Sequence, residues 1–353
     1  MTDAAPQHKR RIRYAGTHPR KFEEKYKELD PSGQQHAHEV AKVMQRGQTP
    51  AGMHRSICVD EILSILNPRP GETGLDATLG YGGHAQALVE RIQPGGRLYG
   101  IDVDPIELPR TTLRLRALGF DENMLVILQR NFCHLNTLLT QTAEGFDFVL
   151  ADLGVSSMQI DNPERGFSFR ASGPLDLRLD PGNGQSASCF LQSVTRQRLR
   201  ELLTDNSDEP FAIPLAAALQ GQYLETTTQL ADLVRATIEE VLERNIPLEK
   251  RASEKKKAVQ RTFQALRIEV NNEFGVLDLF LAQLPACLKA GARVAILSFH
   301  SGEDRRVKKA FQSGARDGTY SSVAADPIRA SFEERHANPR SASAKLRWAI
   351  RTG

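Results

Sequence analysis

The stretch LDATLGYGGHAQALVERIQPGGRLYGID, residues 75–102, decides the fold class of this sequence. Apolar residues predict a short strand over 73–79, and a glycine-rich turn at 80–83 leads from it into a helix predicted over 85–92. A second strand is predicted over 97–101. Glycines between a first strand and a first helix let backbone N–H groups approach a ligand at the helix N-terminus. This arrangement is typical of doubly wound α/β sheets.

The alternation of strands and helices extends beyond this stretch but is interrupted once. Residues 158–255 begin with glycine- and proline-rich loops and continue with helical patterns, and strand and helix patterns resume after them. The sequence therefore predicts an α/β fold, a doubly wound sheet with a helical insertion after the fourth strand. The predicted parts are a basic N-terminal extension at 1–53, an α/β domain formed by 54–157 and 256–353, and the mostly helical insertion at 158–255.

Charge is distributed unevenly along the chain. The formal net charge of the 353 residues is +3, which excludes a strongly basic nucleic-acid tail protein and an acidic solvating chain. Residues 1–53 carry 10 basic and 6 acidic side chains, and residues 301–353 carry 11 and 6, whereas the middle is acidic. Two interpretations stay open: the basic ends contact a polyanion, or they are ordinary solvated termini.

Composition also indicates the cellular compartment and whether a metal site is expected. Four scattered cysteines without a CxxC pair indicate a reduced, intracellular protein. No apolar run approaches the roughly 18–20 residues that a membrane span needs, and no secretory signal is recognisable, so we expect a cytoplasmic protein. The nine histidines form no HExxH or similar ligand spacing, so no metal is expected.

Two acidic residues near the glycine turn favour a nucleoside ligand. Asp102 ends the second predicted strand about 20 residues beyond the turn, where a carboxylate accepts both hydroxyls of an adenosine ribose. A helix N-cap is the alternative, because Asp104 and Pro105 follow. Asp76 lies inside the first strand and suits a ligand with a cationic amino-acid end better than a pyrophosphate. The turn lacks the G-x-G-x-x-G spacing, which counts against an NAD-dependent dehydrogenase.

Two further motifs are predicted at the same sheet edge. FDFVLADLGVSS, residues 146–157, brings Asp152 to the end of the fourth strand. ILSFHSGEDR, residues 296–305, brings His300 to the end of a later strand, where it is either a base or hydrogen-bond donor or a cap of the next helix. No G-x-S-x-G elbow occurs, which disfavours a serine hydrolase.

Several long strings, taken in order, resemble one family. They are DATLGYGGH, YGIDVDP, LADLGVSSMQIDNPERGFSF, GPLDLRLDP, RTFQALRIEVN, AILSFHSGEDRRVK and NPRSASAKLR. Over about residues 54–351 the chain resembles the bacterial 16S ribosomal RNA (cytosine-N4)-methyltransferases. The resemblance implies a class I, Rossmann-like methyltransferase fold and S-adenosylmethionine as cofactor. It also implies methylation of the exocyclic amine of a decoding-site cytidine in the small ribosomal subunit.

From their placement at the sheet edge and at the start of the insertion, we expect Asp152 and His300 to be catalytic, and Arg165, Phe167 and Phe169 to contact the substrate base. The resemblance implies the residues that bind the cofactor. The expected cofactor residues are Gly82, Gly83, His84, Asp102, Phe132, Asp152 and Gln159.

The chain departs from the family pattern in four places. Gly302 replaces a leucine, the insertion segment 209–216 lacks the usual arginines, the segment 311–339 is short, and residues 1–50 are additional. An RNA methyltransferase with a different target nucleotide and a non-catalytic assembly factor therefore stay open as alternatives. The sequence leaves the oligomeric state open between monomer and homodimer.

Overall fold

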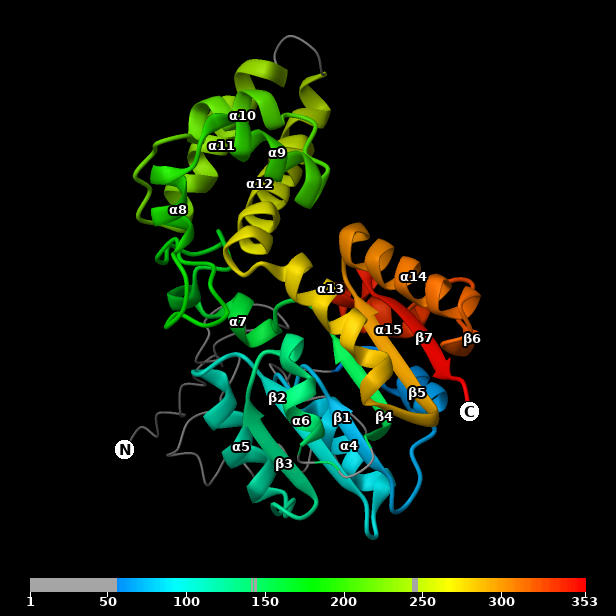
Figure 1. Ribbon diagram of the computed structural model, residues 1–353. Helices are drawn as coiled ribbons and strands as arrows, with labels where there is room; N and C mark the ends of the chain where they lie inside the picture. The colour runs from blue at the N-terminus through cyan, green and yellow to red at the C-terminus, as the bar shows by residue number, and fades with distance from the viewer. Residues whose placement is uncertain (1–55, 141, 143–144, 243–246) are drawn as a thin grey trace, which may run out of the picture. The chain divides into compact units, whose positions relative to one another are not determined.

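The computed structural model describes residues 56–140, 142, 145–242 and 247–353 (Figure 1), so the predicted extension lies outside the described residues. A seven-stranded sheet has the order β3-β2-β1-β4-β5-β7-β6. Strands β1 to β5 run parallel to one another, and β7 is antiparallel to both β5 and β6. The strands are β1 (Thr73–Asp76), β2 (Arg97–Asp102), β3 (Leu125–Gln129), β4 (Phe146–Asp152), β5 (Leu288–Ser298), β6 (Tyr320–Val323) and β7 (Lys345–Arg351).

Helices cover both faces of the sheet, as the doubly wound prediction requires. Phe148 and Leu150 of β4 pack with helices α3, α4 and α5, whereas Phe146 and Val149 pack into a second core with α13 and α14. A strand buried on both faces explains why β4 is a nearly continuous apolar run. These helices are α3 (Val59–Leu66), α4 (Gly83–Ile92), α5 (Glu107–Ala117), α6 (Asn136–Leu139), α13 (Glu273–Gln283) and α14 (Ser301–Arg316).

The segment between β4 and β5 is helical and has a hydrophobic core of its own. Its helix α12 continues without a break through the predicted domain boundary at 255/256, and Phe263 and Leu266 in its later half lie in this core. The helical packing of the insertion therefore extends at least to Leu266. The elements are α7 (Ser157–Asp161), η3 (Pro163–Arg165), α8 (Ala187–Ser193), α9 (Arg196–Ser207), α10 (Ala212–Leu219), α11 (Thr227–Leu242) and α12 (Leu248–Val270).

The C-terminal segment returns to the sheet after β6. It forms α15 (Phe332–Ala337) and the short helix η5 (Pro339–Ser343) before β7. Arg340 of η5 donates to the Asp161 carboxylate at 2.6 Å, which joins this segment to the end of α7. Among the described residues, no helix has the length and apolar content that crossing a bilayer requires.

Candidate active site

The carboxyl ends of β1, β2 and β4 bring Asp76, Asp102 and Asp152 to one edge of the sheet. The sheet changes its winding direction between β1 and β4, and ligands of open α/β sheets bind at such a point. A hydrogen bond joins the loop after β1 to the end of β4, because the Asp152 N–H donates to Thr78 Oγ1 at 2.6 Å. The backbone around the three carboxylates is therefore held in place without using the Asp152 side chain.

His84 and Asp152 face each other at this edge. The distance between His84 Nε2 and Asp152 Oδ2 is 3.5 Å. His84 Nε2 and Asp152 Oδ1 are both buried, and neither has a hydrogen-bond partner among the described residues. Burial acts to lower the pKa of His84, but Asp152, Asp76 and Glu334 outweigh it and raise that pKa. Buried polar atoms are rarely left without partners, so a ligand that completes these hydrogen bonds fits the site.

Asp76 is the most deeply buried of these carboxylates. Burial raises its pKa from 3.8 to about 7, although nearby His84 and the Thr78 N–H oppose the shift. Asp76 therefore exchanges its proton near neutral pH. Perturbed carboxyl groups of this kind are concentrated at functional sites, and a cationic ligand stabilises the ionised form.

Asp102 is oriented by two backbone donors. The Gly80 N–H donates to Oδ2 at 2.7 Å and the Asp104 N–H donates to Oδ1 at 2.9 Å. Each carboxylate oxygen keeps a further lone pair, which suits a ribose diol. The helix-capping alternative belongs to Asp104 instead, whose Oδ1 accepts the N–H of Ile106 at 2.8 Å at the start of α5.

Asp104 also holds the insertion against the sheet. Its other oxygen, Oδ2, accepts hydrogen bonds from Gln159 Nε2 and Arg165 Nη1, both at 2.6 Å. Gln159 Oε1 accepts the Ser156 N–H at 2.7 Å, and Arg165 donates to the Leu179 carbonyl at 2.8 Å. Both predicted ligand-binding side chains are thus engaged inside the protein. Contacts with a cofactor or RNA would have to add to these bonds or replace them.

The two predicted cofactor glycines are required by close packing. A Cβ on Gly82, whose φ is +80°, would lie 2.8 Å from Leu115 Cδ1. A Cβ on Gly83 would lie 2.1 Å from Ser56 Oγ. Both positions let the glycine turn sit against α5 and the segment before α3. A Cβ on Gly80 would make only an ordinary van der Waals contact, 3.7 Å from the Thr78 carbonyl oxygen. The turn is therefore packed most tightly at Gly82 and Gly83.

The predicted aromatic residues are half-buried. Phe132 packs edge-to-face on Phe280, with ring centroids 5.2 Å apart. Phe167 and Phe169 pack on the core of the insertion, where the Phe169 ring centroid lies 5.4 Å from that of Phe263. Phe132 lies directly after β3, whereas Phe167 and Phe169 follow η3 in the insertion.

His300 caps helix α14. Its Nδ1 accepts the Glu303 N–H at 3.5 Å, and its Nε2 lies 3.1 Å from Glu303 Oε1. Burial acts to raise the pKa of Glu303, but the hydrogen bond from His300, the Phe299 N–H and Arg267 outweigh it and lower that pKa. The sequence left open whether His300 is a base or a cap. The structure gives it the capping contact, and its catalytic role stays a prediction.

Glu334 on α15 is a site residue that the sequence did not indicate. It accepts the Cys58 N–H at 3.0 Å, and its charge contributes to the raised pKa of His84. Burial raises the pKa of the Cys58 thiol to about 12, so this sulfur stays protonated and is a poor metal ligand. Glu334 lies 182 positions after Asp152 in the sequence and in no motif quoted above, so no local signal pointed to it.

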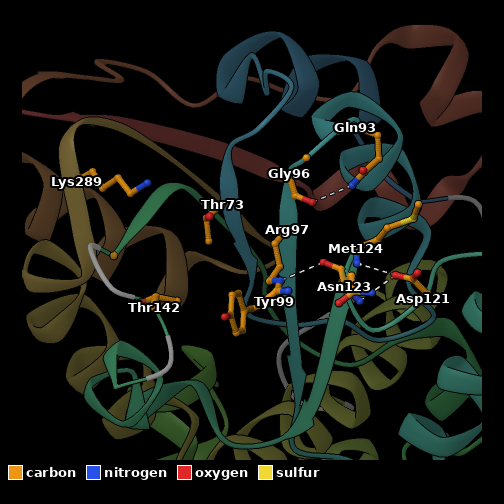
Figure 2. Close-up of a pocket in the computed structure, with 12 residues that line it drawn as sticks. Thr73, Gln93, Gly96, Arg97, Tyr99, Asp121, Asn123, Met124, Thr142 and Lys289 are labelled. Atoms are coloured by element: carbon orange, nitrogen blue, oxygen red, sulfur yellow. Dashed lines mark hydrogen bonds between the residues drawn. The ribbon is translucent and has the colours of Figure 1, made fainter.

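A cavity of about 610 Å³ lies elsewhere on the sheet (Figure 2). Its lining includes Thr73 and Arg97, the first residues of β1 and β2, together with Lys289 at the start of β5. The cavity is therefore at the amino ends of the strands. It contains none of the predicted site residues and is not the candidate active site.

The comparison with protein families decides the assignment. Residues 51–352 match the model of the MraW methylase family. The chain belongs to the MraW methylase family. It is 52% identical over 356 residues to the ribosomal RNA small subunit methyltransferase H 2 of Alkaliphilus metalliredigens, which covers 99% of this chain and 100% of that one. The methyltransferase H of Trichlorobacter lovleyi is 40% identical over 85% of this chain and 98% of its own length.

Family membership settles several of the predictions. The resemblance to ribosomal RNA methyltransferases, the class I methyltransferase fold and the enzymatic, methyl-transferring nature of the protein are confirmed. Membership of a methylase family also excludes the alternative of an NAD-dependent dehydrogenase. The roles assigned to individual site residues stay predictions, as do the domain boundaries.

Proposed function

We propose that this protein transfers a methyl group from S-adenosylmethionine to the exocyclic N4 amine of a cytidine in the decoding region of 16S ribosomal RNA. The observation that carries the proposal lies at the switch point of the sheet, where two buried atoms, His84 Nε2 and Asp152 Oδ1, have no hydrogen-bond partner among the described residues. Membership of the MraW methylase family and relatives named ribosomal RNA small subunit methyltransferase H support the reaction and the substrate. We place the activity in the cytoplasm, where such subunits are assembled.

The charges of the site fit a cationic methyl donor. S-adenosylmethionine, when bound, supplies an activated methyl group on a positively charged sulfur. Asp76 and Asp152 offer carboxylates to a cationic ligand, Asp102 offers lone pairs to the ribose, and Phe132 offers an aromatic face beside the end of β3. The glycine turn at Gly82 and Gly83 supplies the close backbone approach.

Asp152 is the best placed group to activate the amine. The cytosine amine is a poor nucleophile, because its lone pair is delocalised into the ring. A carboxylate that accepts one N–H of this amine localises the lone pair and receives the proton when the new C–N bond forms. Asp152 Oδ1 has no partner among the described residues and is free for this contact. His84 Nε2 lies 3.5 Å from the other oxygen, Oδ2, so a protonated His84 would stabilise the ionised carboxylate by its charge.

The insertion is proposed to receive the flipped base. The Phe167 ring lies 5.7 Å from the Arg165 guanidinium, which contacts Asp104, whereas Phe169 packs on Phe263. An RNA base turned out of its stack can pack on such a ring. Arg165 is then a positioning residue, because its guanidinium ties this loop to the strand that carries Asp102. His300 orients the start of α14 beside the same edge.

Methyl transfer to purified subunits tests the proposal. Small ribosomal subunits from a strain lacking the endogenous enzyme would be incubated with full-length protein and labelled S-adenosylmethionine, and the modified nucleotide would be mapped by mass spectrometry. We expect labelled N4-methylcytidine with the wild-type protein and none with Asp152→Ala. Asp147→Ala is the matched control, because Asp147 lies at the other end of the same strand and has similar exposure. Methylation at another atom, or full activity of Asp152→Ala, would overturn the proposal.

A further inference from the structure

The acidic character of the candidate site creates a problem for RNA binding. Asp76, Asp102, Asp152 and Glu334 lie around the site, and they repel the phosphates of an approaching RNA. Phosphate contacts supply most of the affinity of nucleic-acid-binding proteins. The site therefore needs a cationic surface beside it that holds the RNA backbone while one base enters.

Helix α14 presents such a surface next to the site. It starts directly after His300, at the carboxyl end of β5. Glu303, Val307, Phe311 and Gly314 form its buried side, at the spacing of one helical face. The opposite side of the helix is exposed and carries Arg305, Lys308, Lys309 and Arg316.

The acidic residues of α14 do not neutralise this exposed side. Glu303 is turned inward onto His300. Asp304 accepts hydrogen bonds from Arg347 Nε at 2.6 Å and from Lys345 Nζ at 3.2 Å, so its carboxylate is paired with two cations of β7. Neither carboxylate therefore pairs with the cations of the exposed side.

The cations of this face are also free of carboxylate partners. Within the described part of the chain, no Asp or Glu oxygen lies within 4.0 Å of the charged nitrogens of Arg305, Lys308 or Lys309. Several cations of helix α12 in the insertion are paired instead, for example Arg261, which lies 2.8 Å from a Glu209 oxygen. A cation that has no carboxylate partner does not have to break an ion pair when it binds a phosphate. The α14 face is therefore suited to contact with RNA.

We infer that the exposed face of α14 formed by Arg305, Lys308 and Lys309 binds backbone phosphates of the ribosomal RNA and holds the substrate beside the methylation site. This inference rests on the proposed function, and it assigns the surface that binds the RNA backbone. Arg305 and Lys309 are one helical turn apart and point in the same direction, so they contact neighbouring phosphates of one strand. Such contacts carry no sequence information and contribute through the release of counterions.

A pair of charge-removing variants tests the inference. Full-length Arg305→Gln/Lys309→Gln would be compared with wild type for the KM of small subunits in methyl transfer, and for subunit affinity across a salt series. We expect the KM to rise several-fold, and the slope of log affinity against log salt to fall by about 1 for each lost cation. S-adenosylmethionine affinity, measured by calorimetry, should stay at the wild-type value.

Arg69→Gln/Arg91→Gln is the matched control. Both arginines are exposed and lie near the amino ends of β1 and β2, away from the candidate site, and the change in charge is the same. The control should keep the wild-type KM and salt slope. The inference is overturned if the α14 variant matches wild type, or if both double variants lose affinity equally. Failure of the wild-type protein to methylate subunits at all would instead count against the proposed function.

Discussion

Phe274 occupies the space that a side chain at position 302 would need. A Cβ on Gly302 would lie 2.5 Å from Phe274 Cζ and 3.2 Å from His300 Nδ1. The Phe274 ring lies beside His300, with centroids 5.8 Å apart, and the Arg306 guanidinium stacks 4.2 Å from the Phe274 ring centre. The family resemblance leads one to expect a leucine at this position, and this sequence has glycine. The ring of Phe274 on α13 fills the space beside Gly302.

Gly302 and Phe274 should therefore be energetically coupled. Gly302→Leu alone overpacks the contact, and we expect it to lower the free energy of unfolding by about 1–3 kcal/mol. Phe274→Leu relieves the clash. The double variant should therefore lose less free energy of unfolding than the two single variants lose together, by roughly 0.5–3 kcal/mol. Urea unfolding of the four proteins measures this coupling. Strictly additive effects would show that the two residues do not share one space.

Replacing the buried Asp104 should strongly lower the free energy of unfolding. It is buried together with Arg165, and Asp104→Asn leaves the guanidinium without its counter-charge at 2.6 Å. Breaking a buried ion pair in this way costs about 3–5 kcal/mol. Asp232→Asn is the comparison, since its pair with Arg235 is exposed and worth at most about 1 kcal/mol. Chemical unfolding that gives equal losses for the two variants would contradict this ranking.

Much of the fold follows from local sequence pattern. The apolar spacing of residues 59–66 predicts a helix, and residues 345–351 read as a terminal strand. Helix α3 and strand β7 have these bounds. β1 ends at Asp76 rather than at residue 79, because the Ala77 and Leu79 N–H groups donate to two different strands, β4 and β2. Apolar periodicity cannot reveal which strand a backbone donor will reach.

Charged and polar elements were harder to predict. The apolar pattern predicts a helix only over 262–271, because the residues before it are too highly charged to show an apolar stripe, whereas α12 begins at Leu248. The pair between Lys257 and Glu254, one turn apart at 2.8 Å, supports that earlier part. Short polar α15 was missed entirely, and with it Glu334. Its contact with Cys58 spans 276 positions in the sequence, which no motif encodes.

The basic N-terminal extension offers a prediction from sequence alone, because it lies outside the described residues. Residues 1–50 carry 10 basic and 6 acidic side chains. If these charges contact phosphates, deleting residues 1–50 should weaken binding to small subunits and reduce its salt dependence. Filter binding over a range of salt concentrations checks this. Identical affinity of the two proteins at every salt concentration would make the extension an ordinary solvated terminus.

The buried Asp76 should make stability depend on pH. Its pKa is about 7 in the folded protein and 3.8 as the ordinary value, so between these two pH values the folded state holds more protons than the unfolded state. The free energy of unfolding contributed by Asp76 therefore falls as the pH rises from about 4 to about 7. Asn at this position keeps an oxygen for the Thr78 N–H but has no charge to bury. Asp76→Asn should gain stability relative to wild type at pH 8, and the gain should shrink toward pH 5. Melting temperatures measured across this range check the prediction, and parallel curves for the two proteins would show that Asp76 does not titrate in this window.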